Sequence, residues 1–223
     1  LHLCAALAGR ALAQDPCDIA WEASILVSSD SSVSTVPKIL VLGDTVHVSW
    51  YGLDTTAAGT LTGSGLRYAR SIDGGASFST PVKLLSPFES FPGQIAAGKT
   101  GVFIATTAIL DTFFGIVIFS SLDAGVTWSA QEAVIPAAYP EILFVAGDAL
   151  YLGYREIETS WFGILRSSDD GRTWESVARR IRDLSDVVVS GTQLHGVGPT
   201  PGASRTEVGY YLSRDSGRVW SGP

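Results

Sequence analysis

The sequence predicts an all-β protein made of repeated four-stranded antiparallel sheets. The first observation that predicts this fold is an eight-residue pattern that starts at residues 71, 121, 167 and 213, so that successive copies lie 50, 46 and 46 residues apart. Periods of this size are typical of propellers and solenoids. The second observation is a run of short apolar segments separated by Gly- and Asp-containing turns. The 223 residues, 46% hydrophobic and 17% charged, suit one packed all-β domain. Four strands in each repeat make one blade of a β-propeller.

Four positions of the repeat are fixed: Ser at the first, Asp at the third, Gly at the fifth and an aromatic residue at the eighth. The copies are Ser71, Asp73, Gly75 and Phe78; Ser121, Asp123, Gly125 and Trp128; Ser167, Asp169, Gly171 and Trp174; and Ser213, Asp215, Gly217 and Trp220. Asp and Ser side chains hydrogen-bond to nearby backbone groups, and Gly adopts a positive φ without steric cost. The pattern therefore predicts a turn closed by an aromatic packing anchor.

The repeat resembles the Asp-box of sialidases and related propellers, Ser-any-Asp-any-Gly-any-Thr-Trp. The resemblance implies a β-propeller and a structural role for the boxes, since the family's substrate pocket lies on the other face of the disc. It also implies six blades, of which four are visible here. We therefore expect the chain to be part of a longer protein, and a complete four-bladed ring is the alternative.

The N-terminus resembles the end of a signal peptide. Residues 1–9 are mostly apolar and small, and Ala11-Leu12-Ala13 has the small-any-small form of a cleavage site, although Arg10 interrupts the segment. We expect residues 1–13 to be a partial signal peptide of a secreted or periplasmic bacterial-type protein; an ordinary helix or ragged end is the alternative. Cleavage would remove Cys4 and leave Cys17 single, which excludes a disulfide framework.

The strands follow in order along the chain. Residues 14–36 are predicted to contain a ring-closing strand at 21–28, because this segment resembles those that follow the later boxes. The predicted blades and their strands are 37–88 (39–42, 46–50, 66–71, 82–85), 89–136 (94–97, 102–107, 113–119, 133–135), 137–182 (140–145, 150–154, 163–166, 177–181) and 183–223 (187–190, 194–197, 208–212). The fourth blade lacks its fourth strand.

Because the boxes join strands three and four, a site on the opposite face must use the loops between strands two and three, predicted at 52–64, 108–112, 155–162 and 198–205. The catalytic candidates on or beside these loops are Asp54, Tyr154, Arg155 and Glu156, and the substrate-binding candidates are Trp161, Tyr139 and Arg205. The aromatic rings of Tyr154, Trp161 and Tyr139 could stack on a sugar. Ordinary strand-end and loop roles are the alternative for each.

The resemblance does not extend to the catalytic signature. Sialidases carry an Arg-Ile-Pro tripeptide on the first strand of the first blade, where the Arg grips the substrate carboxylate. This chain has Thr35-Val36-Pro37 there. Asp54 lies in the region that holds the family's acid/base Asp, and the Tyr nucleophile with its partner Glu usually comes from later blades.

The net charge of −7 excludes nucleic acid as a favoured partner, and no apolar run is long enough to cross a bilayer. The single histidines His47 and His195 have no second ligand at metal spacing, so we expect no metal and no cofactor. Two functions remain: a secreted sialidase-like glycoside hydrolase or glycan binder, and a non-catalytic binding or scaffold module. A third class, propeller assembly factors and sorting receptors, shares only the box pattern with this chain.

Overall fold

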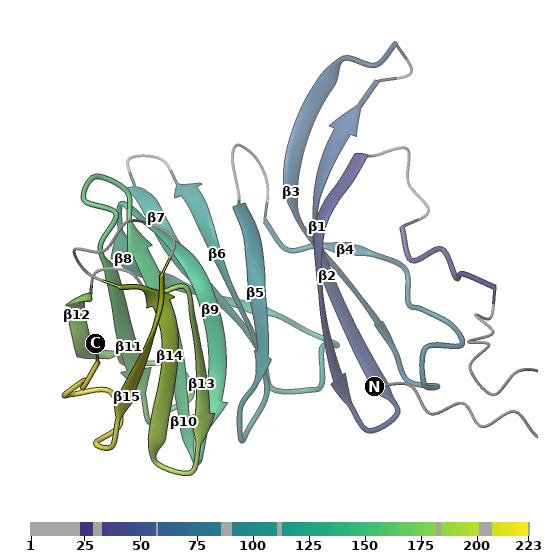
Figure 1. Ribbon diagram of the computed structural model, residues 1–223. Helices are drawn as coiled ribbons and strands as arrows, with labels where there is room; N and C mark the ends of the chain where they lie inside the picture. The colour runs from purple at the N-terminus through teal and green to yellow at the C-terminus, as the bar shows by residue number, and fades with distance from the viewer. Residues whose placement is uncertain are drawn as a thin grey trace, which may run out of the picture.

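The computed structural model describes residues 23–28, 33–56, 58–85, 91–110, 113–181, 184–200 and 207–222. These residues form four antiparallel sheets and no helix (Figure 1). The all-β architecture with four-stranded antiparallel blades is therefore confirmed.

Each sheet is a meander in which neighbouring strands follow one another in sequence. The first contains β1 (Val33–Leu42), β2 (Thr45–Thr55), β3 (Leu61–Ser71) and β4 (Val82–Lys83); the second contains β5 (Phe91–Ala97), β6 (Val102–Leu110), β7 (Phe113–Ser121) and β8 (Ser129–Pro136). The third contains β9 (Ala138–Ala146), β10 (Ala149–Glu156), β11 (Phe162–Ser167) and β12 (Glu175–Ile181), and the fourth contains β13 (Asp186–Ser190), β14 (Gln193–Pro199) and β15 (Val208–Ser213). In the fourth sheet, an isolated bridge from Leu212 to Ser221 stands where a further strand would begin.

The sheets stand in a row, each packed on the next through its first strand, so that β1, β5, β9 and β13 are successive neighbours (Figure 1). The first and fourth sheets lie at opposite ends of this row. Within the described ranges, the sheets therefore do not close into a ring.

The core consists of three apolar clusters, one between each pair of successive sheets. We call the face of a sheet that packs on the following sheet its forward face, and the other its rear face. The forward-face residues of the first, second and third sheets include Leu66 and Tyr68; Phe103, Ile116 and Ile118; and Tyr151, Phe162 and Ile164. The rear-face residues that meet them include Ile104, Val117 and Phe119; Leu143, Leu150 and Leu165; and Val187, Leu194 and Tyr211. Each interface is thus an apolar contact between two packed sheets.

The repeated turns have one geometry. In the second, Ser121 Oγ donates to Asp123 Oδ1 at 2.8 Å, and Oδ1 also accepts the backbone N–H of Thr127 at 2.8 Å. The Gly125 N–H donates to Ser121 Oγ at 2.7 Å, with Gly125 at φ 86°. The three equivalent bonds recur in the other copies, at Ser71, Asp73, Gly75 and Ser77; Ser167, Asp169, Gly171 and Thr173; and Ser213, Asp215, Gly217 and Val219. The turn chemistry expected from the repeat is therefore present in all four sheets.

The first strand of each of the first three sheets carries a β-bulge. The register shifts between Thr35 and Lys38 in β1, between Phe91 and Gln94 in β5, and opposite Gly153–Tyr154 in β9. Prolines 37 and 92 lie inside the first two bulges, where a missing backbone N–H breaks no regular pair. In β9 the bulged residue is Glu141, which has no register partner on β10.

Most strands are longer than predicted, which shortens the predicted loops, whereas the strand predicted at 82–85 spans only Val82–Lys83. Residues 52–55 and 61–64 belong to β2 and β3, paired as Gly52 with Gly65 and Asp54 with Gly63, so the loop predicted at 52–64 is only 56–60. Gly and Thr suggested a loop here, but cross-strand pairing overrode their weak local preference. Asp54 accordingly lies in a strand. Of the predicted ring-closing segment, residues 23–28 form no strand and residues 21–22 lie outside the described residues, so the closure remains a prediction.

Candidate functional site

The four box carboxylates are fully engaged by their own turns. Hydrogen bonds to Ser71 and Ser77 lower the pKa of Asp73 to about 2, and hydrogen bonds to the Thr side chain and backbone lower the pKa of Asp123 and Asp169 to about 2. The backbone N–H of Val219 lowers the pKa of Asp215. A carboxylate held ionised in this way suits turn closure better than proton transfer at neutral pH.

Asp54 lies on β2 between two basic side chains from the next two strands. Its Oδ2 accepts a hydrogen bond from Lys83 Nζ at 2.8 Å, and its Oδ1 forms an ion pair with Arg67. The hydrogen bond from Lys83 lowers the pKa of Asp54, and the charges of Arg67 and Lys83 lower it further. The carboxylate is therefore ionised near neutral pH, which argues against its action as a general acid.

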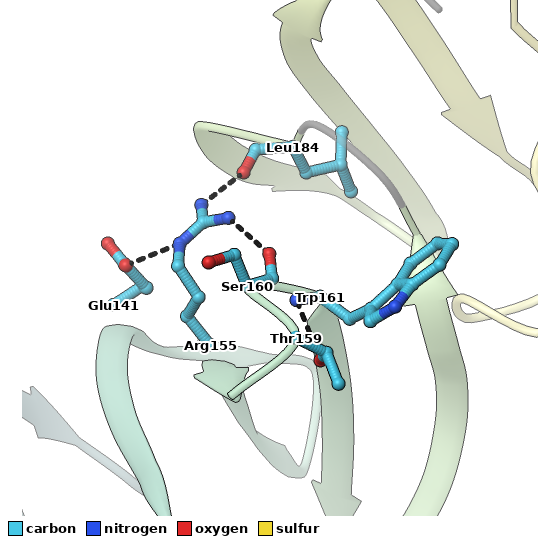
Figure 2. A network of polar contacts seen from close by, with 6 residues as sticks. All are labelled: Glu141, Arg155, Thr159, Ser160, Trp161 and Leu184. Carbon is cyan, nitrogen blue, oxygen red and sulfur yellow. Dashed lines mark hydrogen bonds and ion pairs between the residues drawn. The ribbon is translucent and has the colours of Figure 1, made fainter. Parts of the chain in front are cut away.

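Arg155, at the end of β10, joins three parts of the chain (Figure 2). Its Nε donates to Glu141 Oε1 at 2.9 Å, and its two terminal nitrogens donate to the carbonyl oxygens of Ser160 at 3.0 Å and Leu184 at 3.1 Å. The guanidinium carbon also lies 5.9 Å from the centre of the Phe162 ring. The β9 bulge allows this arrangement, because it lets Glu141 turn out of register toward Arg155. Arg155 thereby holds the β10–β11 loop against the segment that leads to the fourth sheet.

The β10–β11 loop is ordered by short-range hydrogen bonds. Glu156 Oε2 accepts the hydroxyl of Thr159 at 2.6 Å, and the Thr159 hydroxyl in turn accepts the Trp161 backbone N–H at 3.2 Å. The backbone N–H of Glu156 donates to the carbonyl of Trp161 at 2.9 Å. Figure 2 shows the Trp161 indole on the opposite side of this loop from the Arg155 guanidinium. Arg155 and Trp161 are neighbours along the loop without sharing one pocket.

A cavity of about 430 Å³ opens between the second and third sheets beside this loop. Residues of β8 and the β8–β9 link form one wall: Val134, Ile135, Pro136 and Ala137. Tyr154, Leu165 and Trp174 form the wall of the third sheet, and Glu156, Glu158, Thr159 and Ser176 add polar groups. The cavity thus combines apolar and aromatic side chains with a few polar groups, the carboxylates of Glu156 and Glu158 and the hydroxyls of Thr159 and Ser176, which is the general composition of a small-ligand site.

Of the candidates predicted from the sequence, Tyr154, Arg155, Glu156 and Trp161 come together at this end of the third sheet. Tyr139 is the register partner of Arg155, and its ring packs edge-on against Phe114, with centroids 6.0 Å apart. Asp54 is separated from them, since it belongs to the first sheet and the second sheet lies between. Arg205 lies outside the described residues.

Several cavity residues were not among the predicted site residues. Trp174 was assigned to its box alone, yet its ring also faces the cavity. Glu158, Thr159 and Ser176 reach the cavity through the fold of the loop and of β12. The box tryptophans Trp128, Trp174 and Trp220 each pack in the cluster between two successive sheets, so the spacing of the boxes could have indicated this position.

Within the described ranges, no group of three or more His, Cys, Asp or Glu residues could hold a metal ion. No helix there could cross a membrane.

No family model matches the sequence, and a comparison with curated protein sequences gave no match. Solved structures do match. The chain is similar to a Hadza microbial sialidase (20% identity, TM-score 0.65, 85% of this chain and 44% of that one) and to a variant of the NanB sialidase from Streptococcus pneumoniae (11% identity, TM-score 0.64, 88% and 53%). It is also similar to the leech intramolecular trans-sialidase (12% identity, TM-score 0.66, 91% and 53%). The chain spans about half the length of these proteins. At these identities the comparison establishes a sialidase-like β-propeller fold.

Proposed function

We propose that this protein is a secreted, sialidase-like propeller that binds carbohydrate in the cavity between its second and third sheets. The observation that carries the proposal is that the half-buried Trp174 and the Glu156 carboxylate line one cavity of about 430 Å³, with the Tyr154 side chain, 5% exposed, also in its wall. Aromatic rings cover the apolar face of a sugar, and carboxylates accept hydrogen bonds from its hydroxyls. The volume falls within the range usual for small-ligand sites.

Binding is favoured over catalysis by what the polar side chains already do. Asp54 is ion-paired in the first sheet, and the three nitrogens of the Arg155 guanidinium donate hydrogen bonds to Glu141, Ser160 and Leu184. Thr35 stands where the sialidase pattern has an arginine. These observations support the non-catalytic binding module that the sequence left open.

The charge of the cavity favours a neutral sugar or an amino sugar. Glu156 and Glu158 both line it, and none of the Lys or Arg residues that the structure describes does so. Two carboxylates repel an acidic sugar such as a sialic acid, because like charges at short range raise the free energy of binding. The proposed ligand is therefore a neutral or basic glycan unit.

Calorimetry against neutral, amino and sialylated oligosaccharides tests the proposal. We expect Glu156→Gln to weaken binding of the preferred glycan roughly ten- to hundredfold, since a charge-assisted hydrogen bond contributes about 1.5–3 kcal/mol. Asp148→Asn is the matched control, because Asp148 is an exposed carboxylate outside this cavity. The proposal fails if the folded protein binds none of these sugars, or if Glu156→Gln and Asp148→Asn bind equally well.

A second candidate is sialidase-type hydrolysis. Tyr154 and Glu156 line the same cavity, and a Tyr with a partner Glu is the nucleophile arrangement that the resemblance implies. Release of a fluorophore from a sialoside by the wild type, abolished in both Tyr154→Phe and Glu156→Gln, would favour this candidate. No turnover with glycan binding intact would exclude it.

A further inference from the structure

The contact between the forward face of the first sheet and the second sheet, which we call the first interface, contains a buried His–Tyr pair. His47 Nδ1 lies 2.6 Å from the Tyr68 hydroxyl oxygen. His47 is 0% exposed and Tyr68 is 1% exposed. The Tyr68 ring packs edge-on against Trp128 of the second box, with centroids 4.8 Å apart, and its hydroxyl fills the space beside Gly125. The pair is therefore enclosed by the box turn of the second sheet.

The interface between the second and third sheets and the interface between the third and fourth sheets have other side chains at these two positions. Register against the box serine of each sheet assigns Phe103 and Ile118 as the equivalents in the second sheet, and Tyr151 and Ile164 as those in the third. All four side chains pack in the apolar clusters of their interfaces, and none of them takes up a proton at acid pH. Of the three interfaces that the structure describes, the first is therefore the one that has a histidine at this position.

Protonation of His47 would leave its buried ring with too few hydrogen-bond acceptors. An imidazolium donates from both ring nitrogens, whereas the neutral ring donates from one. Nδ1 has the Tyr68 oxygen beside it, but Nε2 is buried and has no hydrogen-bond partner among the described residues. A buried cation with an unsatisfied N–H raises the free energy of the folded state. The closed first interface therefore favours the neutral ring.

The positive charges around His47 also oppose its protonation. Arg70 is the register partner of His47 on β3, and its guanidinium donates to the Ala124 carbonyl of the second box at 2.9 Å. Lys38 on β1 adds positive charge to the same face, since it pairs with Ser49, which lies two residues along β2 from His47. Burial lowers the pKa of His47, and the charge of Arg70 lowers it further.

The second sheet offers no compensating negative charge at this place. Its strands β5, β6 and β7 carry no ionisable side chain. Lys99, in the turn after β5, pairs with Asp148 of the third sheet at 3.6 Å. Asp123, the box carboxylate whose charge acts on Tyr68, is engaged by hydrogen bonds of its own turn. Burial raises the pKa of Tyr68 to about 12, so its hydroxyl stays protonated. An imidazolium at position 47 would gain no ion pair from these groups.

We propose that the first interface is a pH-sensitive switch, in which protonation of His47 at mildly acid pH separates the first sheet from the second. The closed interface binds fewer protons than the open one. Opening therefore becomes more favourable as the pH falls below 6.5, the usual pKa of a histidine, and levels off below the pKa of the buried ring. The second and third sheets, which have Phe103 and Tyr151 at this position, stay packed on their following sheets. The proposal is independent of glycan binding.

Amide hydrogen exchange at pH 7 and at pH 5 tests the proposal. Protection factors, which correct for the intrinsic effect of pH on exchange, report the opening of each strand. An opening that takes up one proton becomes more favourable by up to roughly tenfold per pH unit. We therefore expect protection in β2 and β3 to fall roughly fivefold or more between pH 7 and pH 5, and protection in β10 and β11 to stay unchanged.

The matched variant carries His47→Phe and Tyr68→Ile, the residues that the second sheet has at these positions. It removes the titratable ring and keeps apolar packing, so its protection in β2 and β3 is expected to be the same at both pH values. His47→Asn is a second variant, because asparagine keeps an acceptor for the Tyr68 hydroxyl and does not titrate. His195→Asn is the control: it removes the histidine of the fourth sheet, and it should respond like the wild type. Circular dichroism checks that each variant is folded.

Three outcomes overturn the proposal. Equal protection of the first sheet at pH 7 and pH 5 in the wild type shows that the interface does not respond to protons. A fall that persists in either folded variant without His47 assigns the response to another group. A fall of the same size in β10 and β11 shows a general effect of acid on the protein, and not a switch at one interface.

Discussion

The hydroxyl of Tyr68 in the first sheet occupies the space that a side chain at Gly125 in the second sheet would need. Gly125→Ala is therefore expected to lower the free energy of unfolding by about 2–4 kcal/mol, through collision with a packed ring and through strain at φ 86°. Urea denaturation measures the loss. Gly43→Ala is the control: it has φ 59° and no atom within 4 Å of its Cβ position, so strain alone should cost about 1–2 kcal/mol. Equal losses in the two variants would contradict a steric role for Tyr68.

Tyr68→Phe is expected to destabilise the protein by about 1–3 kcal/mol. It removes the only hydrogen bond recorded for the buried His47 ring within the described residues, and leaves a polar nitrogen without a partner. Tyr210→Phe removes the equivalent hydrogen bond, between the Tyr210 hydroxyl and His195 Nδ1, on an exposed face of the fourth sheet. Its loss of unfolding free energy should therefore be smaller. In the Tyr68→Phe background, Gly125→Ala should be better tolerated than in the wild type, because the nearest colliding atom is gone. Additive losses in the double variant would refute the coupling.

Stability is expected to fall at acid pH through the box turns. Folding lowers the pKa of Asp73, Asp123 and Asp169 from 3.8 to about 2. Their contribution is therefore fully present above about pH 4 and is lost as the pH falls through about 2. Thermal unfolding measured between pH 5 and pH 2 should show this decline. Asp123→Asn removes one of the three groups, so its melting temperature should be lower at pH 5 and should fall less toward pH 2 than that of the wild type. Parallel curves for the two proteins would count against the assignment.

Replacing Arg155 by Gln is expected to loosen the β10–β11 loop. The substitution removes the bond to Glu141 and weakens the two bonds to carbonyl oxygens of Ser160 and Leu184. We expect a loss of about 1–2 kcal/mol and faster amide hydrogen exchange across residues 157–161. Arg166→Gln is the control, because Arg166 forms a more exposed pair with Glu175 on neighbouring strands and should contribute about 0–1 kcal/mol. Unchanged exchange in the loop would show that Arg155 does not hold it.

The boxes made the fold predictable, because one box occurs in each sheet and its Ser, Asp and Gly residues determine the conformation of the turn. Each predicted blade strand in the described ranges was found, and most of these strands extend beyond their predicted ends; β4 is shorter than predicted, and residues 23–28 of the predicted ring-closing segment form no strand. The ends were missed where pairing across a hairpin decides the conformation, as at Gly52, Asp54 and Gly65.

The candidate site was harder to predict, because its partners come from separate segments. Arg155 and Glu156 were identified from the end of a strand, but the bulge that brings Glu141 to Arg155 depends on the register of β9 against β10. The cavity depends on how the second and third sheets meet, and no local pattern describes that contact. The resemblance to sialidases grouped Asp54 with the candidates of the third sheet. Asp54 belongs to the first sheet, and the second sheet lies between them.

The meander of every sheet has a consequence for how the chain folds. All strand pairs join segments that are adjacent in sequence, and the sheets pack on their nearest neighbours along the chain. Closing such short loops has a small entropic cost, so each sheet can assemble soon after its last strand is available. Cooperativity then passes from sheet to sheet through the three apolar clusters, as in a repeat protein. A destabilising substitution in the apolar cluster between the first two sheets should let the first sheet unfold separately, while the third and fourth sheets remain folded together.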